Sequence, residues 1–63
     1  MNTDFRIRNM QAAIDRAEGF EAMAALGGDA LTDTEGYMKK AARSRRHAAW
    51  IEAKIAAHPF SAA

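Results

Sequence analysis

The sequence contains no cysteine, a single proline and few aromatic residues, and much of its 49% apolar fraction is alanine. Without cysteine no disulfide can form, and this absence suits a reducing compartment, so we expect a cytoplasmic protein. A chain of 63 residues that buries mostly alanine gains little stability from apolar burial. Self-association is therefore the stabilising device that we expect.

Long apolar segments are also missing. The longest uninterrupted apolar run, residues 22–26, is too short to span a bilayer, and no apolar segment of signal-peptide length follows the N-terminal charges. The apolar side of the second predicted helix is mostly alanine, which is a poor membrane anchor. We expect no interaction with a membrane.

Motifs for catalysis or metal binding are absent too. His47 and His58 lie eleven residues apart, with no cysteine and no converging carboxylates beside them. Ser44 and His47 could touch on a helix, but no orienting acid or oxyanion donor accompanies them. The sequence predicts no cofactor, no metal site, no small-molecule substrate and no enzymatic activity.

The clearest positive signal is a helical pattern over residues 33–57. Apolar and small side chains recur there at alternating spacings of four and three, which places them on one side of an α-helix. This predicted packing seam consists of Tyr37, Ala41, Ser44, Ala48, Ile51 and Ile55. The seam should face a neighbouring helix, and His58–Pro59 should end the helix before a tail of residues 58–63.

A second helix is predicted over residues 4–26. Its apolar stripe consists of Ile7, Met10, Ile14, Ala17 and Ala24, widened on one side by Ala13, Phe20 and Met23. Gly27–Gly28 provides a helix C-cap, and Thr32 with Glu35 has the spacing of a capping box for the next helix. Leu31 precedes this box as a candidate hydrophobic staple.

A connection over residues 27–32 makes the two helices antiparallel neighbours, so we expect a single all-α domain, a two-helix hairpin spanning residues 1–63. A second apolar column on the later helix, beside the seam, cannot be covered by the same partner. It consists of Met38, Ala42, Ala49, Ala53 and Ala56. We expect a homodimer forming a four-helix bundle, with core or dimer positions at Ile7, Met10, Ile14, Phe20, Tyr37, Met38, Ala41, Ala48, Ile51 and Ile55.

Charge is distributed unevenly although the net charge is only +1. Residues 1–35 carry seven acidic and three basic side chains, whereas residues 36–63 carry six basic side chains and one acidic one. This asymmetry fits two arrangements. The helices attract each other within the fold, or a basic surface is kept for an anionic partner.

One stripe of the later helix combines bases with the single tryptophan. The basic stripe, as we call it, consists of Lys39, Arg43, Arg46, Trp50 and Lys54, flanked by Lys40 and His47. Exposed tryptophan among arginines is typical of interface hot spots. The alternative is a structural one, in which Trp50 folds over the edge of the bundle, under Phe60, and the bases merely solvate the helix.

Three functions remain open on this basis. The first is a protein-binding regulator, an adaptor or inhibitor, that contacts a larger protein with an acidic or mixed surface through Lys39, Arg43, Arg46, His47, Trp50 and Lys54. The second is a nucleic-acid-binding regulator. The alternating residues 4–8 would then form a strand carrying Arg6 and Arg8, and the order of elements resembles the ribbon-helix-helix family, without a specific motif. The third is a purely structural, self-associating bundle.

Overall fold

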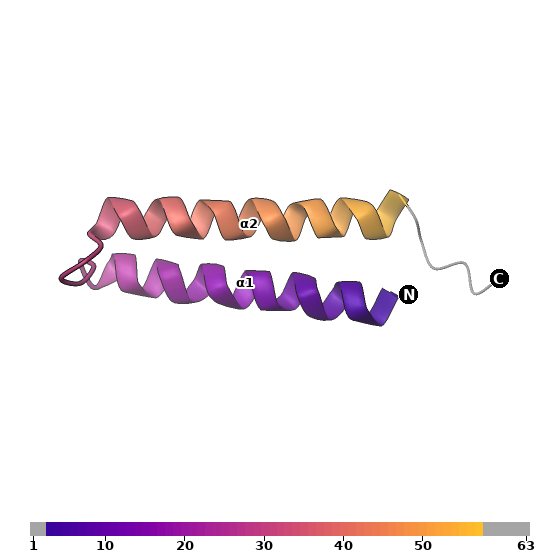
Figure 1. Ribbon diagram of the computed structural model, residues 1–63, viewed down its shortest axis with the longest axis horizontal. Coiled ribbons are helices and arrows are strands. Elements are labelled where there is room, and N and C mark those ends of the chain that lie inside the picture. The colour runs from indigo at the N-terminus through magenta and orange to yellow at the C-terminus, as the bar shows by residue number, and fades with distance from the viewer. Residues whose placement is uncertain (1–2, 58–63) are drawn as a thin grey trace.

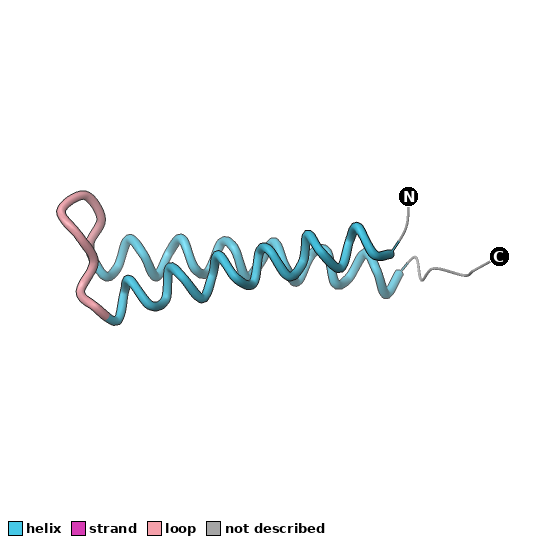
Figure 2. Tube along the Cα trace, turned by 90° about the horizontal axis from the view of Figure 1, so that it is seen from below, coloured by secondary structure: helices cyan, strands magenta, loops and turns pink. Residues whose placement is uncertain are grey.

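The computed structural model describes residues 3–57, which form two long helices joined by a short connection. Helix α1 runs from Thr3 to Ala25 and α2 from Thr34 to Ala57. The helices are antiparallel and lie side by side along their whole length, with the connection at one end (Figures 1 and 2). The predicted two-helix hairpin is confirmed. The predicted tail, with His58, Pro59 and Phe60, lies outside the described residues.

The contact between the helices is made by small side chains. On α2 the buried residues are Ala41, Ser44, Ala48 and Ile51, each no more than 8% exposed, while Tyr37 and Ile55 are half-buried at the two ends. The side of α2 that faces α1 is therefore the predicted seam. Alanine and serine at these positions allow the helix backbones to approach closely.

On α1 the contact side is the alanine part of the predicted stripe. Ala13 and Ala17 are fully buried and Ala24 nearly so, whereas Ile7, at the edge of the predicted stripe, is 44% exposed and the core position predicted for it is wrong. Met10 and Ile14 are half-buried at the margin. The reason is steric, because an alanine column can follow the alanine-rich seam of α2 at short range and a column of isoleucine and methionine cannot.

The C-terminus of α1 closes in a Schellman motif built on two glycines. Gly27 and Gly28 have φ angles of 94° and 85°, in the left-handed region that glycine adopts without strain. The Gly28 N–H donates to the Met23 carbonyl at 2.8 Å and the Gly27 N–H donates to the Ala24 carbonyl at 3.0 Å. The predicted glycine cap is present.

Asp29 organises the connection. Its Oδ1 accepts hydrogen bonds from the backbone N–H groups of Leu31 at 3.0 Å and Thr32 at 2.8 Å. Its Oδ2 accepts a hydrogen bond from the Tyr37 hydroxyl at 2.6 Å. These donors, the Tyr37 hydroxyl first, hold the pKa of Asp29 below its usual value, and the same contact raises the pKa of Tyr37. A single carboxylate thus links the loop to the first turn of α2.

The N-cap of α2 is Asp33 and not Thr32, so the predicted capping box is wrong by one residue. Asp33 Oδ1 accepts from the Gly36 N–H at 2.8 Å, and the Asp33 carbonyl accepts the first helical bond, from Tyr37, at 3.0 Å. The Thr32 carbonyl instead accepts from the Asp29 N–H at 2.7 Å. The backbone of Thr32 therefore takes part in closing the loop.

The predicted hydrophobic staple is also wrong, because Leu31 is 95% exposed. A staple requires the residue that directly precedes the N-cap, and with the cap at Asp33 that residue is Thr32. A different side chain ties the two helix ends together. The Thr34 hydroxyl donates to the Ala24 carbonyl at 3.2 Å, which satisfies a carbonyl near the end of α1.

We predict that Gly28→Ala destabilises the fold by about 2 kcal/mol or more, because φ is positive and the added Cβ would collide with the Thr32 carbonyl oxygen and the Asp33 backbone. Gly19→Ala is the matched control, since apart from the neighbouring backbone of its own helix no atom lies within 4 Å of the added Cβ. Gly19 lies inside α1, so this change should stabilise by up to about 1 kcal/mol. Urea unfolding followed by circular dichroism measures both, and equal effects would contradict the loop geometry.

Candidate functional site

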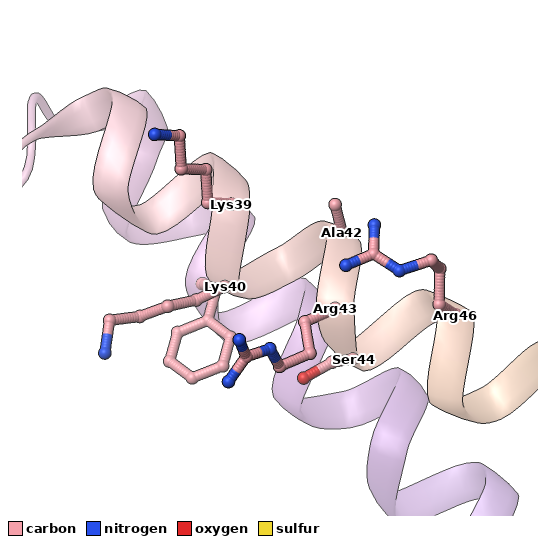
Figure 3. Close-up of a pocket in the computed structure, with 7 residues that line it drawn as sticks. Lys39, Lys40, Ala42, Arg43, Ser44 and Arg46 are labelled. Atoms are coloured by element: carbon pink, nitrogen blue, oxygen red, sulfur yellow. The ribbon is translucent and has the colours of Figure 1, made fainter.

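The basic stripe lies along α2 and away from the seam, because its members occupy the helical positions that the seam leaves free. Every residue of the stripe, with the flanking Lys40 and His47, is exposed. Figure 3 shows that Lys40 and Arg43 extend to one side of α2 while Lys39 and Arg46 leave from the other. The stripe therefore presents a broad band of positive charge and not a single line.

Trp50 is the largest side chain in this band and is 58% exposed. The His47 ring stacks beside it, with 6.1 Å between ring centroids and 12° between planes. The Lys54 Nζ lies 5.3 Å from the centroid of the Trp50 ring, in a cation–π contact. His47 precedes Trp50 by three residues and Lys54 follows it by four, so the geometry of the helix itself places both beside the indole. The indole is thereby held in place while much of its surface remains accessible.

A shallow hollow of about 390 Å³ lies beside Trp50. Arg6 and Asn9 of α1 line it together with the α2 residues Trp50, His47, Ile51 and Lys54. Neither Arg6 nor Asn9 was predicted to adjoin Trp50. The two helices pair antiparallel, which brings the start of α1 beside the end of α2. That pairing is the signal from which Arg6 and Asn9 could have been predicted.

A second hollow, of about 560 Å³, surrounds Arg43 on the same helix (Figure 3). Lys39, Lys40 and Arg46 contribute positive charge to it, and Phe20 reaches it from α1. The Lys40 Nζ lies 5.9 Å from the centroid of the Phe20 ring. Phe20 also packs against Tyr37, with 6.0 Å between centroids. The predicted core position Phe20 is thus only half-buried and serves as part of a surface.

The charges of the stripe are little neutralised within the chain. Lys39 pairs with Glu35 at 3.8 Å, and both side chains are highly exposed. Within residues 3–57 no ion pair joins Arg43 or Arg46 to a carboxylate. These two guanidinium groups therefore remain available to acids from another molecule.

Arg45 behaves differently although it adjoins Arg46 in sequence. It donates from Nε and Nη2 to the two carboxylate oxygens of Glu21 at 2.7 and 2.8 Å, linking α2 to α1 in a bidentate pair. This hydrogen bonding lowers the pKa of Glu21 and raises that of Arg45. Beside the pair is a hollow of about 290 Å³, and its lining includes Met10, Ile14 and Ala49.

Arg6 and Arg8 lie in the first turns of α1, because residues 4–8 are helical. The strand predicted for the ribbon-helix-helix alternative is therefore wrong. Arg6 is half-buried at the Trp50 hollow, whereas Arg8 is exposed. The two arginines do not form a paired set on a ribbon.

Residues 3–57 contain no group of three His, Cys, Asp or Glu side chains placed to hold a metal ion. Neither α1 nor α2 has the length and apolar character that crossing a bilayer requires. Ser44 is buried in the seam, whereas His47 stacks on the exposed Trp50. The two side chains therefore lie in different environments.

Comparison with known proteins gives no further assignment. No protein-family model, no curated protein and no solved structure matches the chain. The interpretation of the site therefore depends on its own residues.

We predict that Trp50→Ala changes the free energy of unfolding by no more than about 1 kcal/mol, because the side chain lies on the surface and loses only its contacts with His47 and Lys54. The neighbouring Ile51→Ala is the control, since Ile51 is 5% exposed and its truncation should cost about 2–4 kcal/mol. Thermal or urea unfolding compares the two. A large loss on Trp50→Ala would identify Trp50 as a core residue and contradict the exposed placement.

Proposed function

We propose that this protein is a small non-enzymatic regulator, an adaptor or inhibitor, that binds a larger protein through the basic stripe and acts as a homodimer. The observation that carries the proposal is the exposed Trp50 fixed between His47 and Lys54. A tryptophan that is immobilised before binding loses little conformational entropy on binding, which favours its use as an anchor. The bulk of its ring remains to be buried by a partner.

The charges beside this anchor favour an acidic partner surface. Arg43 and Arg46, which pair with no carboxylate in the described part of the chain, are placed to donate bidentate hydrogen bonds to a partner's carboxylates. Lys39 and Lys54 lie toward the ends of the stripe and would raise the association rate by steering. In this proposal Trp50 makes the apolar contact with the partner, and Arg43 and Arg46 make the specific polar contacts.

Dimerisation is proposed from the weakness of the single-chain core. Among residues 3–57 the buried set contains five alanines, one serine and one isoleucine, and no larger side chain. At the same time Met38 is 52% exposed, and the second apolar column of α2 is exposed throughout. A second hairpin covering this column, with Met10 and Ile14 at its edge, would complete a four-helix bundle.

Nucleic acid is the competing partner class, and no observation favours it over protein. The helical conformation of residues 4–8 removes the strand that a ribbon reader would insert into a groove. Binding of phosphates by the basic stripe alone would depend strongly on salt and little on Trp50. The same experiments therefore separate the two classes.

We predict that Ala49→Glu weakens self-association by roughly tenfold or more, because it places a charge in the apolar column. Ala22→Glu is the matched control, as Ala22 is exposed on α1 and outside that column. Analytical ultracentrifugation gives the dissociation constants, and circular dichroism checks that helix content is retained. A wild-type chain that stays monomeric at high micromolar concentration would overturn the dimer.

We also predict that Trp50→Ala abolishes capture of the partner protein while helix content and self-association are unchanged. Immobilised wild-type protein, Trp50→Ala and the off-stripe variant Arg8→Ala are compared as baits. The captured protein is then purified, and its affinity is measured directly. Retention of binding by Trp50→Ala, or loss by Arg8→Ala as well, would contradict the assignment of the stripe.

A further inference from the structure

The two hollows on the basic stripe follow each other along α2. Residues 39–46 of α2 line one hollow and residues 47–54 line the other. The first hollow contains Phe20 and the second contains Trp50. Phe20 contacts Tyr37 and Lys40, so it lies level with the first turns of α2, ten or more residues before Trp50, or about 15 Å or more along the helix. The surface therefore offers two apolar positions at a fixed separation.

Cations surround both positions. Lys40 lies against the Phe20 ring and Lys54 against the Trp50 ring, and Arg43 and Arg6 add guanidinium groups to the first and second hollow. No acidic side chain of the described residues lines either hollow. An occupant must therefore supply negative charge next to each apolar group.

We infer that the occupant is an acidic amphipathic helix of the partner protein, lying along α2 with two apolar side chains eleven residues apart and acidic residues beside each. Two positions eleven apart lie on the same side of a helix and about 16.5 Å apart along its axis, which matches the separation of Phe20 and Trp50. Helix-in-groove binding uses such anchors. This inference rests on the proposed function and specifies the partner's shape.

The test uses three synthetic helical peptides that lack tryptophan. The first has two leucines eleven residues apart, each flanked by glutamates. The second has the same composition with the leucines nine apart, which puts them on opposite sides of the helix. The third replaces every glutamate of the first with glutamine. Trp50 is the only tryptophan of the chain, so its fluorescence reports binding at the stripe, and calorimetry measures the affinity.

The eleven-spaced acidic peptide should bind roughly tenfold more tightly than the nine-spaced one, because only the former fills both hollows. The glutamine peptide should bind more weakly than the acidic one. Arg43→Glu and Lys54→Glu should each weaken binding by roughly tenfold, whereas the matched charge reversal Arg8→Glu, away from the stripe, should change it by less than about twofold.

Equal binding of the two spacings, no binding of either, or sensitivity to Lys54→Glu alone would overturn the two-hollow arrangement. If capture of the natural partner still depends on Trp50 in that case, the proposed function stands and only the shape of the partner is wrong. Duplex DNA that shifts Trp50 emission where the acidic peptide does not would overturn the inference in favour of nucleic acid.

Discussion

The close approach of two alanine columns determines how the rest of this hairpin is arranged. Ala13 and Ala17 of α1 meet the side of α2 that contains Ala41 and Ala48, and none of these positions is more than 7% exposed. A contact of this kind leaves little room for large side chains between the helices, and among residues 3–57 Ile51 is the largest side chain buried there. Phe20, Met10 and Ile14 are half-buried at the margins of the seam, and Trp50 is exposed.

The acidic residues at and near the connection stabilise the fold, whereas most of the basic residues of the stripe on α2 make no ion pair within residues 3–57. Asp29 and Asp33 are engaged in the connection and the helix cap, and Glu21 holds Arg45. Attraction between an acidic and a basic helix explains only this last pair among residues 3–57. Most bases of the stripe have no such role, and this surplus is the physical basis for assigning them to a partner.

Sequence periodicity predicted α2 better than α1, and the reason lies in the composition of the two stripes. On α2 the column that contains Tyr37, Ile51 and Ile55 is also rich in small residues, so the most apolar column and the one that fits the contact side are the same. On α1 the most apolar column, with Ile7 and Ile14, competes with an alanine column, and steric fit selects the latter. The cap was misplaced for a similar reason, since Thr32 and Asp33 are both good N-caps and only the loop hydrogen bonds decide between them. Arg6 and Asn9 line the Trp50 hollow only because the two helices pair. A local sequence pattern carries no information about that pairing.

The two margins of the seam differ in charge, although Ala42 of the second apolar column also lines the Arg43 hollow. Along α2 the consecutive residues Ala49 and Trp50 point 100° apart and fall on opposite sides of the seam. The Ala49 side carries Met10 and Ile14 with the paired Arg45 and with Glu52, whereas the Trp50 side carries unneutralised cations. A largely apolar surface suits association with an identical chain, because few like charges meet across it. A uniformly cationic surface opposes self-association for the converse reason, so the proposed dimer forms through the Ala49 side and leaves the Trp50 side to the proposed acidic partner.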